Sequence, residues 1–503
     1  MVRVAIVHYH LHPGGVTRVI QQTLAALAAA NSAIRTVTLT GEPPQADMPI
    51  EPYVVVEWLR YGTTLHAPIS RLADELRAAA TQALGGRPDI WHIHNHALGK
   101  NLTLPAVVAH LAEQGERLLL HIHDFAEDGR PANYRLLQAL CAPLPLYPQG
   151  THVMYGVLNQ RDHRFLAAAG VSEAQLRDLP NPIHREAVSP PGKGKGWFVD
   201  GATSTLSRTP PQPLPGGEYG GFERLILYSV RGIRRKNLGE FLLWSALAES
   251  DETFALTRAP QNPAEQPRYA EWVALAEALR LPVTFDLGKQ WAGTFDSLIA
   301  AASAIMTTSV AEGFGLTFLE PWLADREVVG RKLPEITAEF EQAGIDLSGL
   351  YDHLWIPLEW IGRERFEQEI RNALPPVYAA YSRVATPDDM RRAVNAAING
   401  DMVDMGRLSE TLQQDVISQA TQSAAKRAEI RPARLLTEGK QTERIRRNRE
   451  IIERQFHLSG YGARLRRIYE DLAAAPITAL PPLDPQRLLD QFLAPERFCL
   501  LRT

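Results

Sequence analysis

A glycine-rich turn between two glutamates constrains this chain more than any other stretch. Residues 309–320 read Ser-Val-Ala-Glu-Gly-Phe-Gly-Leu-Thr-Phe-Leu-Glu. The apolar run just before them predicts a buried strand, and the leucines that follow repeat at helical spacing. Gly313 and Gly315 let the backbone turn sharply between the two elements. Because a helix start presents N–H groups and a positive dipole end, the stretch predicts a phosphate site.

The glutamates on either side of this turn extend the prediction to a whole ligand. Glu312 precedes the predicted helix, and Glu320 lies about two turns along it. Carboxylates on both sides of a phosphate site suit a ligand with a charged middle and hydroxyl groups at both ends, which describes a nucleotide sugar. The alternative is a plain strand–turn–helix junction whose glutamates are solvated.

Length and composition limit the class of protein. A chain of 503 residues has room for two or three domains, and 45% hydrophobic and 22% charged residues are ordinary for a globular protein. The net charge of -4 gives no overall attraction to nucleic acid. Cys141 and Cys499 are the only cysteines, which argues against a disulfide framework and against a cysteine metal site.

The chain opens directly on a strand pattern, and no apolar run reaches the roughly 18 residues of a membrane span. We therefore expect a cytoplasmic enzyme without a transmembrane segment. Residues 426–467 hold 13 Lys and Arg against five Glu, which favours a solvated helix surface and leaves peripheral membrane contact open.

The stretch 309–320 closely resembles the E-x7-E signature of retaining, metal-independent glycosyltransferases with the GT-B fold, the family 4 (glycosyl transferases group 1) type. The resemblance covers roughly residues 1–184, 222–340 and 445–472. It implies that Glu312 orients the donor sugar and that Glu320 holds the ribose. The turn between them would complete the donor site with Gly313, Phe314, Gly315 and Leu316.

Two further strand ends resemble motifs of the same family. His-Pro-Gly-Gly at 12–15 follows the first predicted strand, and the resemblance implies that Gly14 and Gly15 face the donor phosphates. The segments 88–95 and 118–124 end in polar residues, as expected where ligands bind at the carboxyl ends of strands. By resemblance, His123 faces the reacting sugar.

Histidines at these strand ends raise the question of a metal. His92 and His94 are predicted to pack or to cap a loop. The histidines alternate on separate predicted strands without a carboxylate-supported ligand spacing, so we expect no metal site.

A basic turn follows the first strand of the second half of the chain. Family members carry an Arg and a Lys at such a strand end, where both clasp the donor diphosphate. Arg231 and Lys236 have that spacing, and Arg234 and Arg235 offer a competing register. An arginine fork and a lysine point charge both suit phosphate oxygens, whereas the alternative is a solvated basic turn.

The resemblance implies an α/β protein with the GT-B fold, in which two Rossmann-like domains face each other across a cleft. The expected parts are an acceptor-side domain at 1–184, a loop or linker at 185–221 and a nucleotide-sugar domain at 222–340. A helical insertion at 341–440 and closing helices at 441–503 complete the chain. The match loosens after Glu320: Pro321 predicts an early first turn or kink, and Arg331 and Lys332 stand where relatives carry glycines.

The expected function is a retaining glycosyltransferase that moves a hexose from a nucleotide diphosphate sugar to an acceptor hydroxyl. No cofactor or metal is expected, no nucleic acid partner is expected, and the acceptor (a sugar, a small molecule or a lipid-linked group) is not indicated. One alternative is a GT-B phosphorylase or epimerase-like enzyme. Another is a non-catalytic protein that binds a nucleotide or a sugar.

Overall fold

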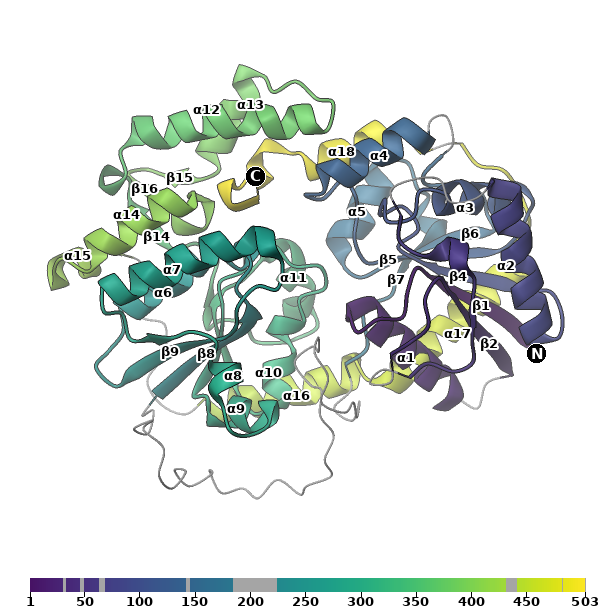
Figure 1. Ribbon diagram of the computed structural model, residues 1–503, viewed down its shortest axis with the longest axis horizontal. Coiled ribbons are helices and arrows are strands. Elements are labelled where there is room, and N and C mark those ends of the chain that lie inside the picture. Colours follow the sequence, from purple (N-terminus) through teal and green to yellow (C-terminus); the bar gives the residue numbers. More distant parts are fainter. Residues whose placement is uncertain are drawn as a thin grey trace. The chain divides into compact units, whose positions relative to one another are not determined.

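A computed structural model describes residues 1–29, 33–45, 49–62, 68–141, 145–183, 224–430, 441–481 and 483–502. The chain divides into two compact units (Figure 1). Unit 1 comprises Met1–Gly196, Ala380–Ser382 and Glu453–Leu493, and unit 2 comprises Trp197–Ala379, Arg383–Ile452 and Ala494–Thr503. The predicted linker at 185–221 lies outside the described residues.

Unit 1 is built on a seven-stranded parallel sheet in the order β3-β2-β1-β4-β5-β6-β7. Its strands are β1 (Val2–His8), β2 (Ile34–Thr40), β3 (Tyr53–Val55), β4 (Ile90–His94), β5 (Leu118–Ile122), β6 (Val153–Val157) and β7 (Leu176–Asp178). Its helices are α1 (Gly15–Ala29), α2 (Ile69–Leu84), α3 (Leu104–Glu113), α4 (Pro131–Cys141), α5 (Gln160–Ala168), α17 (Leu458–Ala474) and α18 (Pro485–Phe492).

The central strands of this sheet are buried on both faces, which explains their nearly continuous apolar sequences. Helix α17, far along the chain, packs against α1 and supplies part of the core beside the sheet. Gly462 makes this approach close, because a Cβ there would lie 2.9 Å from the carbonyl oxygen of Ala26. The hydroxyls of Thr23 and Tyr461 hydrogen-bond across the same contact at 3.0 Å.

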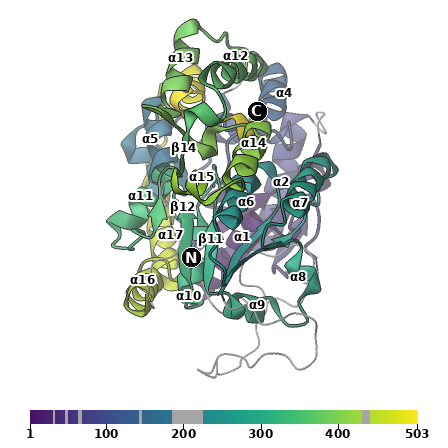
Figure 2. The same cartoon turned by 90° about the vertical axis from the view of Figure 1, so that its left-hand side faces the viewer.

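Unit 2 contains a six-stranded parallel sheet in the order β10-β9-β8-β11-β12-β13. The strands are β8 (Arg224–Arg231), β9 (Glu252–Arg258), β10 (Val283–Thr284), β11 (Ala304–Thr307), β12 (Glu327–Arg331) and β13 (Leu350–Tyr351). Figure 2 shows α6 (Leu238–Ala246) and α7 (Gln266–Ala278) on one side of the sheet and α11 (Pro334–Gln342) on the other. The short helices α8 (Leu287–Gln290), α9 (Phe295–Ala301) and α10 (Glu320–Leu323) complete it.

The predicted helical insertion at 341–440 contains helices and also a small antiparallel sheet in the order β14-β16-β15. Its strands are β14 (Trp355–Pro357), β15 (Ile398–Asn399) and β16 (Met402–Asp404), each too short to show an alternating sequence pattern. The helices from this point on are α12 (Arg363–Ala380), α13 (Pro387–Asn395), α14 (Glu410–Ala420), α15 (Ala424–Ala428) and α16 (Thr442–Gln455).

Both large sheets are doubly wound, so the predicted α/β fold with two Rossmann-like domains is confirmed. In each sheet the strand order reverses once, between β1 and β4 in unit 1 and between β8 and β11 in unit 2. Ligands of open parallel sheets bind outside the carboxyl ends of the strands at such a reversal. The fold therefore gives each unit one favoured place for a ligand.

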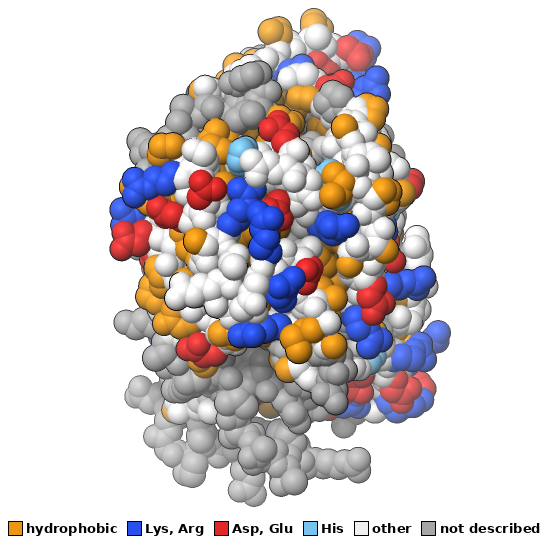
Figure 3. Space-filling view, turned by 90° about the vertical axis from the view of Figure 1, so that its right-hand side faces the viewer, with side chains coloured by type: hydrophobic (Ala, Val, Ile, Leu, Met, Phe, Trp, Pro, Cys, Tyr) orange, Lys and Arg blue, Asp and Glu red, His pale blue; other side chains and the backbone are white. Residues whose placement is uncertain are grey.

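Surface charge is mixed, as the near-neutral composition predicts. Basic and acidic side chains are interspersed with apolar ones on the face shown in Figure 3. In the basic segment, Arg446 is paired with Glu443 and Glu450, and Arg449 with Asp325. These pairs favour a solvated helix surface over a site for an anionic partner, although residues 431–440 lie outside the described part. Within that part, no helix is long and apolar enough to cross a bilayer.

Candidate active site

Two loops meet at the strand reversal of unit 2 and are hydrogen-bonded into one structure. The first follows β8 and contains the basic turn, and the second follows β11 and contains the glycine-rich turn. The Thr308 hydroxyl donates to the carbonyl oxygens of Lys236 and Asn237, at 3.0 and 3.1 Å. The backbone N–H of Val310 donates to the carbonyl oxygen of Arg235 at 3.0 Å. The two predicted donor motifs therefore share one frame.

Lys236 and Glu312 form the charged centre of these loops. The Lys236 ammonium donates a short hydrogen bond to a Glu312 carboxylate oxygen, and both side chains are largely buried. Burial on its own raises the pKa of Glu312, but the charges of Lys236 and Arg235 outweigh it and leave that pKa below its usual value. Burial lowers the pKa of Lys236, and the charge of Glu312 partly offsets this effect. The pair is therefore ionised at neutral pH.

The three arginines of the basic turn have different surroundings. Arg234 donates to the Glu410 carboxylate and to the Leu500 carbonyl, both at 3.1 Å. Arg235 donates to the Ala311 carbonyl at 3.0 Å. The guanidinium of Arg231, at the end of β8, makes no hydrogen bond or ion pair within the described part of the chain. The sequence offered two choices for the phosphate-binding arginine. Arg234 and Arg235 are hydrogen-bonded within the protein, whereas the guanidinium of Arg231 is available for a ligand.

Arg235 is the residue that sequence reasoning underrated. Its guanidinium lies 3.5 Å from the second Glu312 oxygen, so two cations converge on that carboxylate. The family pattern directs attention to Arg231 and Lys236 and gives Arg235 only as a competing register. Arg235 reaches Glu312 only because the loop after β11 lies against the basic turn, and the local sequence does not reveal this contact.

The glycine-rich turn requires glycine at one of its two positions. Gly315 has φ +87° and precedes a short 3₁₀ helix, Leu316–Phe318. A Cβ at Gly315 would lie 2.8 Å from the Ile336 side chain. Phe314 supports the turn from within, because its buried ring packs edge-to-face on Phe340 at 5.7 Å.

The sequence predicted one continuous helix from the glycine-rich turn past Glu320, and this prediction is wrong. The 3₁₀ turn ends at Phe318, and α10 covers only Glu320–Leu323, with Pro321 in its first turn. The early first turn expected at Pro321 is confirmed, and it explains the break: proline has no N–H to continue the preceding turn. Glu320 therefore begins a helix, with its side chain buried, and its ribose contact stays a prediction.

We expect Gly315→Ala to destabilise unit 2 more than Gly400→Ala. Gly400 also has positive φ (+60°), but a Cβ there meets no atom within 4 Å. Both variants bear the cost of about 1–2 kcal/mol for a left-handed alanine, and only Gly315→Ala adds a clash with Ile336, worth about 1 kcal/mol or more. Urea denaturation of the two variants measures the difference, and equal losses would show that the turn relaxes around the new methyl group.

The two cations that replace family glycines are bound to carboxylates of unit 2. Arg331 is buried and forks between Glu240 and Asp404, at 2.6 Å from each. Lys332 donates to Glu341 at 3.2 Å. The side chain of Arg331 is therefore committed to carboxylates inside unit 2, whereas the Lys332 pair is exposed.

In unit 1, His123 follows β5 at the carboxyl edge of the sheet. Its Nε2 lies 2.9 Å from Nδ1 of His94, and its backbone N–H donates to the Asn95 side chain at 2.7 Å. Burial lowers the pKa of His123 to about 4, so its imidazole is neutral at pH 7. Gly14 and Gly15 precede and begin α1, and added Cβ atoms there would meet nothing closer than 3.8 Å. Their predicted donor contacts stay predictions.

The structure brings together histidines that the sequence left on separate strands. Because β4 and β5 are neighbours, His92, His94 and His121 share one face, with ring nitrogens within 4.8 Å of one another. The His92 and His94 rings are stacked at 4.4 Å with 26° between their planes, and His92 is hydrogen-bonded to Tyr469. Among the described residues, no carboxylate contacts the trio. We interpret it as a packed neutral cluster, and the absence of a metal stays a prediction.

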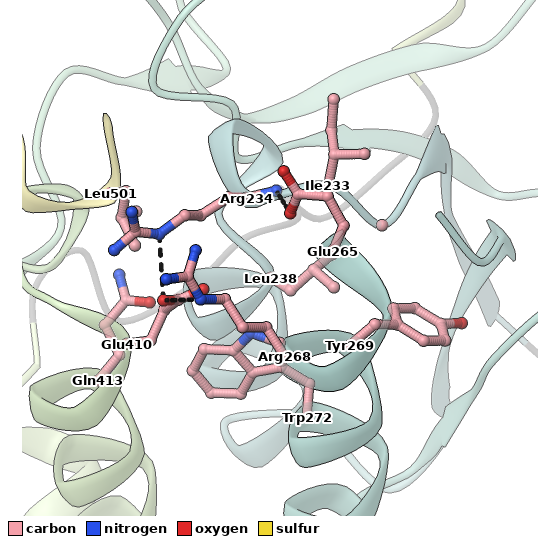
Figure 4. Close-up of a pocket in the computed structure, with 11 residues that line it drawn as sticks. Ile233, Arg234, Leu238, Glu265, Arg268, Tyr269, Trp272, Glu410, Gln413 and Leu501 are labelled. Atoms are coloured by element: carbon pink, nitrogen blue, oxygen red, sulfur yellow. Dashed lines mark hydrogen bonds and ion pairs between the residues drawn. The ribbon is translucent and has the colours of Figure 1, made fainter. Parts of the chain in front are cut away.

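A small hollow in unit 2 was not predicted (Figure 4). It brings together Arg234, Arg268 and Glu410, residues far apart in the sequence, and Trp272 lines it. Figure 4 shows both guanidinium groups directed at the Glu410 carboxylate, with distances of 3.1 and 3.4 Å. Because Glu265 also lines the hollow, two carboxylates balance the two guanidinium groups, and the hollow does not resemble a phosphate site.

No protein-family model matches the sequence. The chain is 24% identical over 425 residues to mannosylglucosyl-3-phosphoglycerate synthase from Petrotoga mobilis, which covers 81% of this chain and 79% of the relative. A glycosyltransferase structure from Rickettsia africae matches with a TM-score of 0.51 at 11% identity, over 94% of this chain and 99% of the other. Sucrose-phosphate synthase from Thermosynechococcus elongatus matches with a TM-score of 0.49 at 14% identity, over 94% and 100%. The Rickettsia africae match shows the fold of this chain, so the predicted GT-B fold is confirmed.

Proposed function

We propose that the protein is a retaining glycosyltransferase that moves a hexose from a nucleotide diphosphate sugar to an acceptor hydroxyl without a metal ion. The observation that carries this proposal is the arrangement at the strand reversal of unit 2. There the ionised Lys236–Glu312 pair lies on loops shared with the uncommitted Arg231 and the turn at Gly315. This is the set of groups that a diphosphate and a sugar require.

The chemistry assigned to these groups is electrostatic. As the bond between sugar and diphosphate breaks, negative charge grows on the leaving phosphate oxygens. Fixed cations in a partly dry site stabilise such charge most in the transition state. Arg231 supplies a planar fork and Lys236 a point charge, which together take the place of a divalent cation.

Because Lys236 is paired with Glu312, donor binding would replace one partner of each side chain by another. An arriving diphosphate attracts the Lys236 ammonium, and this frees lone pairs of the Glu312 carboxylate to accept hydrogen bonds from sugar hydroxyls. Arg235, 3.5 Å from Glu312, keeps that carboxylate ionised during the exchange. The neutral His123 can exchange a hydrogen bond with a sugar hydroxyl without adding charge. In a retaining reaction, the acceptor enters on the face that the leaving group vacates.

The Petrotoga mobilis relative supplies the first substrates to test. Its name describes a product in which mannose is attached to glucosyl-3-phosphoglycerate. We therefore propose a mannose nucleotide as the first donor and glucosyl-3-phosphoglycerate as the first acceptor. A donor of this kind fits the cytoplasmic location expected from the sequence.

A transfer assay with EDTA tests the proposal. The protein is incubated with mannose and glucose nucleotides and the acceptor, and the anomeric configuration of the product is read by NMR. We expect undiminished transfer in EDTA, with the configuration of the donor retained. An inverted product, or transfer abolished by EDTA and restored by a divalent cation, would contradict it. A requirement for inorganic phosphate would favour a phosphorylase, and donor binding without turnover a binding protein.

A further inference from the structure

A cluster of polar and aromatic side chains at the carboxyl edge of the unit 1 sheet has no role in the donor chemistry. It consists of His10 and His12 after β1, Glu42 after β2, Tyr61 after β3 and Lys100 after β4. These strands are neighbours in the sheet, so their ends converge beside the reversal between β1 and β4. The cluster therefore lies where a ligand of this unit is expected.

Tyr61 is the exposed aromatic member of this cluster. Its side chain is 43% exposed, one of few large apolar side chains that are so exposed in the described part. The ring packs edge-on against His10 at 4.6 Å and against Tyr9 at 5.4 Å. Its hydroxyl makes no hydrogen bond with the described residues. A ring that is supported by its neighbours and partly exposed is a surface on which the C–H face of a sugar can stack.

The loop that carries Tyr61 is held in place by several backbone contacts. Asn101 donates to the Trp58 and Arg60 carbonyls at 2.7 and 3.0 Å. The Gly62 N–H donates to the Lys100 carbonyl at 2.8 Å. Gly41 allows the loop to lie close, since a Cβ there would lie 2.1 Å from the Arg60 nitrogen. The tyrosine is thus positioned before any ligand arrives, which lowers the entropy lost on binding.

Lys100 places a positive charge over this ring. Its ammonium lies 5.5 Å from the centroid of Tyr61 and has no carboxylate partner among the described residues. The two nearby carboxylates are already engaged, Glu42 with His12 at 2.9 Å and Asp124 with Arg130 at 2.7 Å. A ligand with its own negative group would therefore pair with Lys100 without displacing an existing ion pair.

We propose that this cluster is the acceptor subsite, and that it takes a sugar carrying a carboxylate or phosphate substituent, with the ring on Tyr61 and the anionic group at Lys100. The proposal rests on the proposed transferase function and adds the residues that would bind an anionic acceptor and select it over a neutral one. Glu42 and His12 lie at the rim, where they can exchange hydrogen bonds with acceptor hydroxyls. A neutral acceptor would use the ring and the rim but would leave Lys100 without a counter-ion.

Titration of the whole protein with three probes tests this proposal. The probes are glucosyl-3-phosphoglycerate, glucosylglycerate, which has only the carboxylate, and neutral glucosylglycerol. We expect at least one anionic probe to bind at least tenfold more tightly than the neutral one. Lys100→Met should remove that preference, and Tyr61→Ala should weaken all three probes about tenfold. The carboxylate-only probe decides whether phosphate or carboxylate is recognised.

The matched control is Lys426→Met, which removes another lysine that lies over an aromatic ring, 4.9 Å from the centroid of Trp360 in unit 2. It should leave the preference for an anionic probe intact. Equal affinity of the wild-type protein for charged and neutral probes, or an unchanged preference in Lys100→Met, would overturn the proposal. Release of nucleotide from a donor without acceptor, measured separately, tests the donor chemistry, so failure of the transferase function and failure of the acceptor subsite give different results.

Discussion

Replacing Lys236 by alanine is expected to lower kcat/KM for the donor by about 100- to 1,000-fold, the usual loss when one fixed charge-stabilising donor is removed. Lys236 is the buried cation on the loop after β8, and its charge is set against Glu312 before any donor binds. Without it, the leaving diphosphate would have only Arg231 and backbone N–H groups. Arg235 still neutralises Glu312, so we expect the variant to fold.

Lys332→Ala is the matched control for this prediction. Lys332 also follows a strand of unit 2, but its ammonium is bound to Glu341 and lies 3.6 Å from Asp352. We expect this variant to keep the wild-type kcat/KM for transfer within about twofold. Equal activity of Lys236→Ala and the wild-type protein at subsaturating donor would remove Lys236 from the phosphate role. An equal loss in both variants would indicate a general effect of lost charge.

Mild acid is expected to unfold unit 1. Burial lowers the pKa of His8 and His92 to about 3 and of His96 and His123 to about 4, and it holds those of His94 and His121 well below 6.5. These imidazoles stay neutral in the folded state but take up protons in the unfolded state below pH 6.5. Their contribution to stability is therefore present above that pH and lost as the pH falls. At pH 5.5 the loss amounts to about 1.4 kcal/mol of unfolding free energy per histidine.

Three groups in unit 1 act in the opposite direction. Burial raises the pKa of Glu127 to about 7 and also raises that of Asp162, and the carboxylates of Glu173 and Asp178 outweigh partial burial to raise that of His163. All three bind protons more readily in the folded state, so they stabilise it as the pH falls. At pH 5.5 each of the six histidines gains about nine-tenths of a proton on unfolding, whereas Glu127 loses about one and His163 hardly changes, so the net uptake is roughly four protons.

The slope of unfolding free energy against pH measures this proton uptake directly. Urea denaturation at pH 7.5, 6.5 and 5.5, followed by circular dichroism, should show a steep loss of stability below pH 6.5. His110 serves as the control position, because it lies on α3 outside the cluster, and His110→Gln should leave the slope unchanged. A slope that corresponds to fewer than about two protons would show that the histidines protonate within the folded unit.

The sequence predicted those parts of the fold that depend on local pattern. Apolar runs such as 304–306 identify buried parallel strands, and glycine pairs mark the turns that follow them. The spacing that the resemblance implies also identified Lys236 and Glu312, which contact each other in the structure; their contacts with a donor stay predictions. Both residues lie on short loops that directly follow strands, so local sequence was sufficient to identify them.

The remaining features depend on contacts between distant segments. Arg331 stands where relatives carry a glycine, and its side chain is bound to Asp404 on a strand of three residues that no periodicity reveals. The acceptor cluster is similar, since Tyr61 and Lys100 meet only because β3 and β4 end at the same edge of one sheet. Such contacts follow from strand order, which a local pattern does not specify.

A crystal structure of the protein with a nucleotide diphosphate sugar tests the central claim most directly. We predict phosphate oxygens within about 3 Å of the Arg231 guanidinium and the Lys236 ammonium, with the backbone of the turn at Gly315 closing the site. We also predict that Glu312 accepts a hydrogen bond from the sugar. A diphosphate bound elsewhere, with Lys236 still paired to Glu312 and Arg231 in solvent, would contradict the account.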